Sequence, residues 1–305
     1  MENLEKRYSF TYIDRCNMCD SGLAAHKVLG KRLSQSQGKN PRNKIGITTT
    51  VLACAQCGLI CANPQPRPCD ISDHYGVPAE AYWPNSYFET GDDYFKKEIL
   101  TLKELYEFTP GDTALDIGAG IGKCMIALEN AGFEVCGIEP SEPFHMYAIA
   151  RMNIDPGKLA LCSIEQADFP KNHFDFITFG AVLEHLYNPS ESIHKAMGWL
   201  KKGGIMQIEV PSSDWLINKI SNLFYRLQGL DYVSNISPMH EPYHLYEFSL
   251  RSFKENGKRN NYEIAHHDYY VAQTYMPKLL NVFLVPYMKY TNQGMQLCVW
   301  LKKGP

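Results

Sequence analysis

The stretch from residue 113 to residue 210 alternates short apolar runs with segments of helical periodicity, and this alternation constrains the fold most strongly. The apolar runs are 113–117, 134–138, 159–162, 174–179 and 204–210. The helical segments between them are 122–131, 141–152 and 190–201. Parallel strands need a crossover connection, which is usually a helix. The pattern therefore predicts an α/β fold with a parallel sheet covered by helices.

The segments on either side are expected to extend this core. A helix is expected over about 93–107 and another after Ser249, and an apolar stripe beginning at Trp215 predicts an inserted helix. Two late strands are expected near 266–271 and 296–301. They would bring the total of predicted strands in this part of the chain to seven.

The loop after the first apolar run reads LDIGAGIGK (115–123), and several kinds of nucleotide site use such a loop. A dinucleotide fingerprint, G-x-G-x-x-G, needs its third glycine where this chain has Lys123. A phosphate loop, G-x-x-x-x-G-K-[ST], needs a glycine where Ile117 stands and a hydroxyl where Cys124 stands. Both phosphate-binding patterns therefore fail at specific positions.

Acidic residues near the ends of the first two apolar runs favour an adenosine without phosphates as the ligand. Asp116 lies near the end of the first run and Glu139 directly follows the second. A carboxylate offers acceptors for both hydroxyl groups of a ribose. The third run is followed by Ile164 and Glu165, which can border an adenine. The structural alternatives are loop capping by Asp116 and simple surface exposure of Glu165.

These motifs resemble those of class I S-adenosylmethionine-dependent methyltransferases. The matching segments are LDIGAGIG (115–122), GIEPS (137–141), FDFITFGAVLEHLYNP (174–189) and LKKGGIMQIEVP (200–211). Together they cover about residues 112–211 in the family's order and spacing. The resemblance implies a Rossmann-like seven-stranded sheet whose last strand is antiparallel, and S-adenosylmethionine as cofactor. The two late strands fit the hairpin that the family has at the end of its sheet.

The resemblance also implies a set of cofactor-binding residues. The glycine loop would pack against the methionine part and the ribose, Glu139 would bind the ribose diol, and the end of the fourth strand would pass beneath the sulfonium. The residues expected at the cofactor are Asp116, Gly118, Ala119, Gly120, Glu139, Pro140, Ile164, Glu165, Gly180 and Ala181. Tyr82 and Tyr87 are expected to join them through cation–π contact with the sulfonium. The alternative for the two tyrosines is hydrophobic packing between the N-terminal segment and the core.

Two groups of residues are candidates for catalysis. His185 follows the fourth strand, at the edge of the sheet where open α/β sheets bind ligands, and it can act as a base, orient an acceptor or cap a turn. The stretch PMHEPYHLYEF (238–248) adds His240, Glu241 and His244 on the insertion. The order H-E-P-Y-H matches a zinc-protease pattern, but Pro242 would disrupt the helix which that pattern needs.

Two Cys-x-x-Cys pairs predict a structural zinc site near the N-terminus. The pairs are Cys16 with Cys19 in CNMC and Cys54 with Cys57 in CAQCG. Each pair places two thiolates on one tight turn, which suits tetrahedral zinc. Unliganded cysteines or a redox pair are the alternatives.

The chain is expected to divide into three parts. Residues 1–72 form a zinc-ribbon-like segment, and prolines 64, 66 and 68 mark an extended linker at its end. Residues 73–110 form an aromatic linker and helix that act as a lid. Residues 111–305 form the methyltransferase domain, with an acceptor-site insertion at about 212–248.

Composition and charge restrict the partners. The net charge is −3, from 30 basic and 33 acidic residues without a dense basic stripe, so nucleic acid is not a favoured partner. The N-terminus carries no signal-peptide pattern and no apolar stretch is long enough to span a bilayer, so we expect a cytoplasmic protein without a membrane partner.

A resemblance to bacterial methyltransferases of nucleotide-linked deoxysugars, which carry a zinc-binding N-terminal segment, bears on the acceptor. It implies methyl transfer to a small molecule, a sugar or glycan precursor or a natural-product intermediate in a biosynthetic pathway. The alternatives are a catalytically inactive methyltransferase-fold zinc protein that serves as a binding module, and a methyltransferase that acts on RNA or protein.

Overall fold

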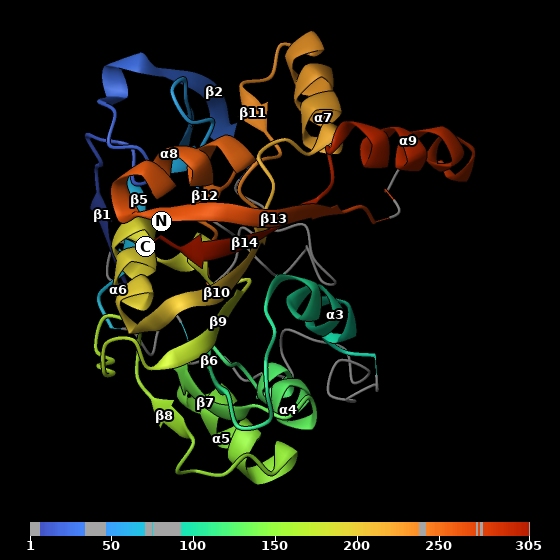
Figure 1. The fold of residues 1–305 in the computed structure, drawn as a ribbon. Coiled ribbons are helices and arrows are strands. Elements are labelled where there is room, and N and C mark those ends of the chain that lie inside the picture. Colours follow the sequence, from blue (N-terminus) through green and yellow to red (C-terminus); the bar gives the residue numbers. More distant parts are fainter. Residues whose placement is uncertain are drawn as a thin grey trace.

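The centre of the molecule is a seven-stranded sheet with the strand order β13-β14-β10-β9-β6-β7-β8 (Figure 1). The computed structural model describes residues 7–33, 47–70, 75, 93–237, 242–272, 274 and 277–304. The strands of this sheet are β6 (Thr113–Ile117), β7 (Glu134–Glu139), β8 (Leu159–Leu161), β9 (Phe174–Gly180), β10 (Leu200–Pro211), β13 (Tyr262–Tyr270) and β14 (Gln296–Lys303).

Strand direction within this sheet confirms the fold predicted from the sequence. β6, β7, β8, β9 and β10 pair in parallel. β14 is antiparallel to both of its neighbours, β10 and β13. The carboxyl ends of the parallel strands therefore lie along one edge of the sheet, which brings the loops after Ile117, Glu139, Leu161 and Gly180 together.

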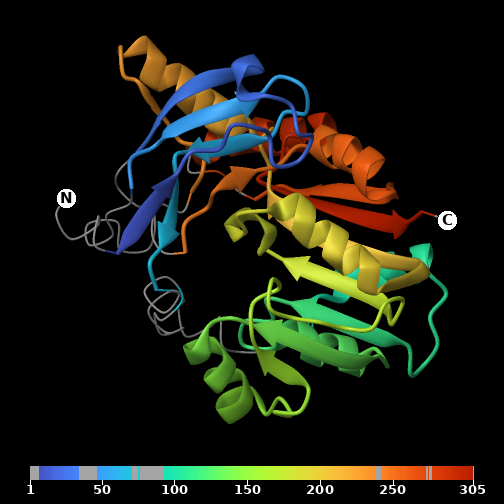
Figure 2. The ribbon, with the colours of Figure 1, turned by 90° about the vertical axis from the view of Figure 1, so that its left-hand side faces the viewer.

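Helices cover both faces of the sheet. Successive side chains on a strand point to opposite faces, and apolar side chains on both faces are buried against helices. Ala114 faces the layer of α3 (Lys96–Leu105), α4 (Lys123–Asn130) and α5 (Glu142–Met152). Leu115, the next residue, faces the layer of α6 (Pro189–Trp199) and α8 (Leu250–Asn260). The three-layer arrangement is visible in Figure 2.

The structure differs from the expected elements in places. The helix expected over 190–201 ends at Trp199, because Leu200 is already extended and pairs with Phe174 as the first residue of β10. The proline-marked linker is in part strand β5 (Gln65–Pro68), which pairs antiparallel with β1 (Tyr8–Thr11). Proline is tolerated there because this strand pairs on one side only.

A second sheet joins the N-terminal segment to the insertion. Its strand order is β11-β2-β3-β4-β12. The strands are β2 (His26–Arg32), β3 (Thr50–Cys54), β4 (Ile60–Asn63), β11 (Tyr232–Val233) and β12 (Tyr246–Glu247). β11 and β12 come from the stretch predicted to insert into the methyltransferase domain. The insertion thus provides both edges of the sheet whose middle strands come from the N-terminal segment.

Two short 3₁₀ helices and two further α-helices complete the described elements. The 3₁₀ helices are Leu23–Ala25 and Leu183–His185. α7 (Leu216–Leu227) is the predicted inserted helix. α9 (Lys278–Thr291), which contains Pro286, was not expected from the sequence. None of the helices in the described parts of the chain is long and apolar enough to cross a bilayer.

Candidate cofactor and acceptor site

A cavity of about 500 Å³ lies at the carboxyl ends of β6, β7, β8 and β9. Its walls come from the glycine loop, the Glu139 turn, the segment after β8 and the loop that follows β9. Arg67 and Pro242, which are remote from this region in sequence, also line it. A volume in this range is typical of pockets for small molecules.

Glu139 is held rigidly in the cavity wall by two backbone amides. Its Oε2 accepts a hydrogen bond from the Gly120 N–H at 2.7 Å, and its Oε1 accepts one from the Ser141 N–H at 2.8 Å. Each carboxylate oxygen has a second lone pair, so both can still accept from a pair of vicinal hydroxyls. Burial raises the pKa of Glu139 to about 7, although the two amides act in the opposite direction.

The glycine loop needs glycine for two different reasons. Gly118 has a φ of +72°, and a Cβ there would collide with the side chain of Val182. Gly120 has a φ of +56°, and the space above it is nearly open. A Cβ on Gly180 would meet nothing within 4 Å, because that position faces the cavity. The backbone is therefore exposed to a ligand at both Gly120 and Gly180.

The structure brings most of the predicted cofactor residues to this cavity. Those in its wall are Gly118, Gly120, Glu139, Pro140, Ile164, Glu165, Gly180 and Ala181. Asp116 and Ala119 are buried and are not among the lining residues. Tyr82 and Tyr87 lie outside the described residues. The aromatic segment does reach the cavity at Tyr75, whose carbonyl accepts a hydrogen bond from the Ser141 hydroxyl at 2.6 Å.

Asp116 lies in the strand behind the glycine loop. It is 3% exposed, and its Oδ2 has no hydrogen-bond partner among the described residues. Burial, with a smaller contribution from Glu139, raises its pKa to about 7. The carboxyl groups of Asp116 and Glu139, each with a pKa of about 7, thus lie beside each other near the ends of β6 and β7.

The loop after β9 brings a carboxyl group and two imidazoles together. His185 lines the cavity, and its Nδ1 lies 3.1 Å from the carbonyl oxygen of Tyr243. The rings of His185 and His244 are in edge contact, with centroids 4.8 Å apart. Glu184 is 1% exposed, and its Oε1 lies 3.8 Å from His244 Nε2. His240 and Glu241, the other predicted catalytic residues, lie outside the described residues.

The Glu184–His185–His244 cluster combines properties of a proton-handling site and of a metal site. Its ligand-capable atoms lie within 4.8 Å of one another. Burial raises the pKa of Glu184 to about 8. Sequence reasoning identified the two histidines and missed Glu184, because a glutamate beside a histidine has no distinctive pattern of its own.

Arg67 is a second residue that sequence reasoning missed. It lies on β5, and its guanidinium carbon is 4.4 Å from the centre of the Tyr187 ring, beside the cavity. Among the described residues no carboxylate pairs with Arg67, and its buried Nε has no hydrogen-bond partner. The cavity therefore has acidic groups near the glycine loop and a basic group on the side of the N-terminal segment.

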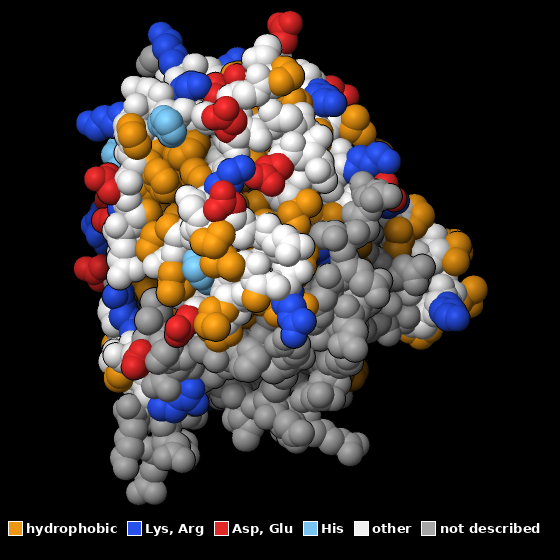
Figure 3. All heavy atoms as spheres, turned by 90° about the horizontal axis from the view of Figure 1, so that it is seen from below, with side chains coloured by type: hydrophobic (Ala, Val, Ile, Leu, Met, Phe, Trp, Pro, Cys, Tyr) orange, Lys and Arg blue, Asp and Glu red, His pale blue; other side chains and the backbone are white. Residues whose placement is uncertain are grey.

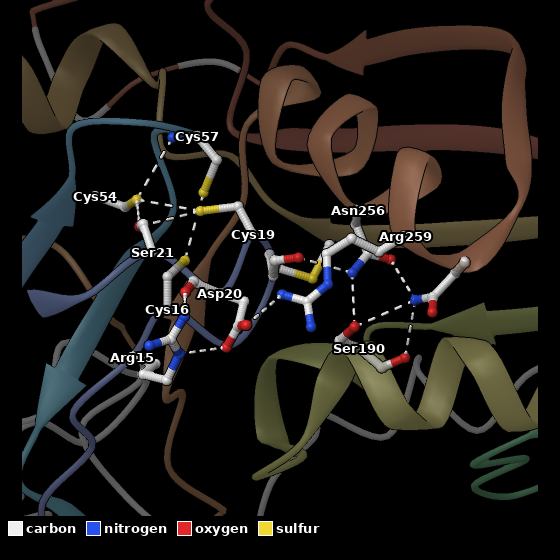
Figure 4. A network of polar contacts seen from close by, with 12 residues as sticks. Arg15, Cys16, Cys19, Asp20, Ser21, Cys54, Cys57, Ser190, Asn256 and Arg259 are labelled. Carbon is white, nitrogen blue, oxygen red and sulfur yellow. Dashed lines mark hydrogen bonds and ion pairs between the residues drawn. The ribbon is translucent and has the colours of Figure 1, made fainter.

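The four predicted metal-binding cysteines converge on one point (Figure 4). The Sγ atoms of Cys16 and Cys57 are 3.5 Å apart, and those of Cys19 and Cys54 are 3.6 Å apart. Tetrahedral zinc with bonds of about 2.3 Å separates its sulfur ligands by roughly 3.8 Å. The arrangement of the four sulfurs therefore fits a zinc ion.

The cysteine turns contact both the cavity wall and the helix layer. Asn17 Nδ2 donates to the carbonyl of Tyr187 at 3.1 Å. Asn256 of α8 donates to the carbonyl of Met18 at 2.9 Å (Figure 4), and Ser249, which caps α8, donates to the carbonyl of Cys57 at 2.7 Å. The geometry of the four sulfurs is thus linked to the position of the loop that carries Tyr187.

Known proteins resemble the methyltransferase part of the chain. A family model described as a methyltransferase domain matches residues 89–267. The ubiquinone biosynthesis O-methyltransferase of Bradyrhizobium diazoefficiens is 28% identical over 125 residues, which cover 40% of this chain and 47% of that protein. Phosphoethanolamine N-methyltransferase 2 of Caenorhabditis elegans is 25% identical over 153 residues, which cover 47% of this chain and 35% of that protein. The chain spans at most about half the length of these curated relatives.

Solved structures support the same fold. A chain in the complex between the Haloferax volcanii Trm112 methyltransferase activator and the putative methyltransferase aligns with a TM-score of 0.54 and 17% identity. The alignment covers 77% of this chain and 98% of that chain. The family model covers more than half of the sequence, and the sheet has the order and the antiparallel last strand described above. The chain therefore belongs to the methyltransferase-domain family and has the fold of the class I S-adenosylmethionine-dependent methyltransferases.

Proposed function

We propose that this enzyme transfers the methyl group of S-adenosylmethionine to a small molecule, a sugar or glycan precursor or a natural-product intermediate. The observation that carries the proposal is the cavity that joins Glu139 to His185. Its volume of about 500 Å³ suits a cofactor and a small acceptor. Methyl transfer is an in-line displacement, so holding the two reactants in one cavity supplies much of the rate acceleration.

In this proposal the adenosine end of the cofactor lies at Glu139 and Ile164, and the sulfonium lies above Gly180. Glu139 accepts hydrogen bonds from the ribose hydroxyls with the lone pairs that the two backbone amides leave available. The open space at Gly180 lets the ligand approach the backbone closely. The acceptor then enters from the side of His185 and Arg67.

His185 is the proposed base for an acceptor hydroxyl. When its Nδ1–H donates to the Tyr243 carbonyl, the neutral ring carries its lone pair on Nε2. That atom can take the proton which the hydroxyl loses as its oxygen bonds to the methyl carbon. His244 is in edge contact with His185 and lies 3.8 Å from Glu184, so a carboxyl group that ionises above its pKa of about 8 lies near the resulting imidazolium.

Arg67 supports an acceptor that carries an acidic group. An unpaired guanidinium at the cavity wall binds carboxylate or phosphate in a bidentate manner. The aromatic ring of Tyr187 fixes its orientation from one side. No carboxylate of the described chain pairs with Arg67, and the acidic group of the acceptor would take that place.

The four cysteines are proposed to hold one structural zinc ion. Their separations fit tetrahedral sulfur coordination, and all four positions would be filled by protein. Such an ion supplies a cross-link between the two turns. The turns in turn position Asn17 against the Tyr187 loop of the cavity.

The test compares His185→Gln with His194→Gln, which changes an exposed histidine of α6. Methyl transfer from isotope-labelled S-adenosylmethionine is measured on a panel of nucleotide sugars, sugar phosphates and hydroxy acids. We expect His185→Gln to lower turnover by roughly 10²- to 10⁴-fold with unchanged affinity for S-adenosylhomocysteine. Undiminished turnover in His185→Gln would contradict the assignment of His185 as the base. An absence of turnover across the panel would oppose the small-molecule acceptor.

A further inference from the structure

α7 exposes several large apolar residues, while its inner side carries two asparagines besides the buried Ile217. Asn222 Nδ2 donates to Asn235 Oδ1 at 2.7 Å, and Asn218 Nδ2 donates to Glu247 Oε1 at 3.3 Å, both on the inner side of the helix. The exposed side carries Leu223, Phe224 and Leu227, which are 55%, 57% and 79% exposed. A helix that packs on a core by its apolar stripe has the opposite arrangement. The apolar side of α7 is therefore available to something outside the described chain.

α9 exposes even more apolar surface. It extends away from the edge of the central sheet (Figure 1), and Met288 is the one buried residue along its length. The exposed apolar residues are Leu279, Leu280, Val282, Phe283, Tyr287 and Tyr290. Nine of the nineteen large hydrophobic residues exposed in the described chain lie on α7 and α9. Such a concentration marks an interaction surface, because single exposed hydrophobic residues are otherwise scattered.

The two helices approach each other at one end and carry charges of one sign. The N–H of Leu216, the first residue of α7, donates to the carbonyl of Gln293, just after α9, at 3.3 Å. Neither helix contains an acidic residue. Arg226, Lys278 and Lys289 have no ion-pair partner among the described residues, and the right-hand projection in Figure 3 shows a basic side chain among orange ones. We call the exposed apolar residues of α7 and α9 together with these three cations the basic apolar face.

We propose that the basic apolar face docks on a lipid surface that contains anionic headgroups. Helices that lie in a membrane interface combine leucine and aromatic residues on one side with lysine or arginine. The basic charges complement anionic headgroups, which attract cations near the membrane surface. A second copy of the chain fits this face less well, because an isologous dimer would place two identical sets of cations in one interface.

This proposal concerns docking at the membrane surface, not crossing of the bilayer. It departs from the expectation of no membrane partner, which was drawn from the absence of a signal-peptide pattern and of an apolar stretch long enough to span a bilayer. The net charge of −3 averages over 305 residues, whereas the basic apolar face gathers only positive charges and large apolar side chains. The docking proposal does not depend on which acceptor the enzyme methylates.

The test is sedimentation of the full chain with vesicles of phosphatidylcholine alone and of phosphatidylcholine with 30% phosphatidylglycerol. We expect binding to the anionic vesicles that weakens with salt, and little binding to the neutral ones. Neutralising Arg226, Lys278 and Lys289 to Gln should weaken binding by about fivefold for each cation. Phe283→Asp and Leu227→Asp should each weaken it by at least roughly tenfold.

Matched controls separate this face from the rest of the surface. Leu161→Asp changes a half-exposed leucine of β8, and Lys202→Gln changes an exposed lysine near the start of β10. Both should leave vesicle binding unchanged. Unchanged affinity of each variant for S-adenosylhomocysteine shows that it is folded. Equal binding to neutral and anionic vesicles, or full binding by Phe283→Asp, would overturn the proposal. A dimer in light scattering that Phe283→Asp dissociates would assign the face to a second copy instead.

Discussion

At the scale of single residues, the site contains two buried carboxyl groups, Glu139 in the cavity wall and Glu184 next to the cavity-lining His185. Glu139 is positioned by two backbone amides, and Glu184 is positioned beside two imidazoles. Burial raises the pKa of the first to about 7 and of the second to about 8. Both groups therefore change protonation in the range where the enzyme would be assayed.

Affinity for S-adenosylhomocysteine is predicted to rise with pH up to about 7. The protonated form of Glu139 can accept fewer hydrogen bonds from the ribose diol, so the ligand prefers the ionised form. The dissociation constant should fall about tenfold for each pH unit below the pKa and level off above it. Calorimetry from pH 5.5 to 8.5 measures this, and a flat profile would contradict the assignment of Glu139.

The candidate site was predictable from the sequence only where residues are close to one another along the chain. Glu139 is the last residue of its strand, and Gly118 and Gly120 lie in one recognisable loop, so local spacing was sufficient. Arg67 reaches the cavity because β5 packs near the loop after β9, which is a tertiary contact without a local signal. A lone arginine among prolines gives no indication of such a role.

At the scale of elements, strands β6, β7, β8 and β9 were predictable because each is a short apolar run bounded by polar residues or glycine. α9 was not, because Pro286 lies inside it and the helix packs through little more than Met288. β11 and β12 are two residues long and depend on pairing with the N-terminal segment. Strands of two residues are too short to show an alternation of apolar and polar residues in the sequence.

Cys54→Ser is predicted to release zinc and to destabilise the two cysteine turns. Since the turns are hydrogen-bonded to α8 and to the Tyr187 loop, we expect the melting temperature to fall by roughly 10 °C. Elemental analysis should show about one zinc per wild-type chain. Cys69→Ser, which changes an exposed cysteine outside the cluster, is the control and should retain both metal and stability. A metal-poor wild type of full stability would exclude a structural zinc.

At the scale of the whole molecule, the central sheet and the N-terminal sheet are connected through the insertion and a shared core. The insertion supplies both edges of the N-terminal sheet, and Met18 and Leu59 belong to the same buried cluster as Leu115. The chain also contains several buried or half-buried carboxyl groups whose pKa is raised to about 7 or 8 by burial. They are Asp116, Glu139, Glu184, Glu209 and Glu247.

Stability is predicted to decrease as the pH rises from 5.5 to 8.5. A carboxyl group whose pKa is higher in the folded than in the unfolded state favours folding while it is protonated, and this contribution is lost as the pH rises through the folded-state value. We expect the free energy of unfolding to fall by a few kcal/mol and the melting temperature by roughly 5–10 °C. Calorimetric melting of the zinc-loaded protein measures this. A melting temperature that rises over the same range would show that the buried carboxyls are already ionised.

The most direct test of the central claim, a methyl-donor site built around Glu139, is calorimetric titration with S-adenosylhomocysteine. Wild type and Glu142→Gln, which changes an exposed glutamate in the adjacent turn, are predicted to bind with the same affinity. Glu139→Gln is predicted to bind about 10- to 100-fold more weakly, because a charged acceptor of the ribose hydroxyls is lost. Equal affinity of Glu139→Gln and wild type, or no binding by the wild type, would contradict the account.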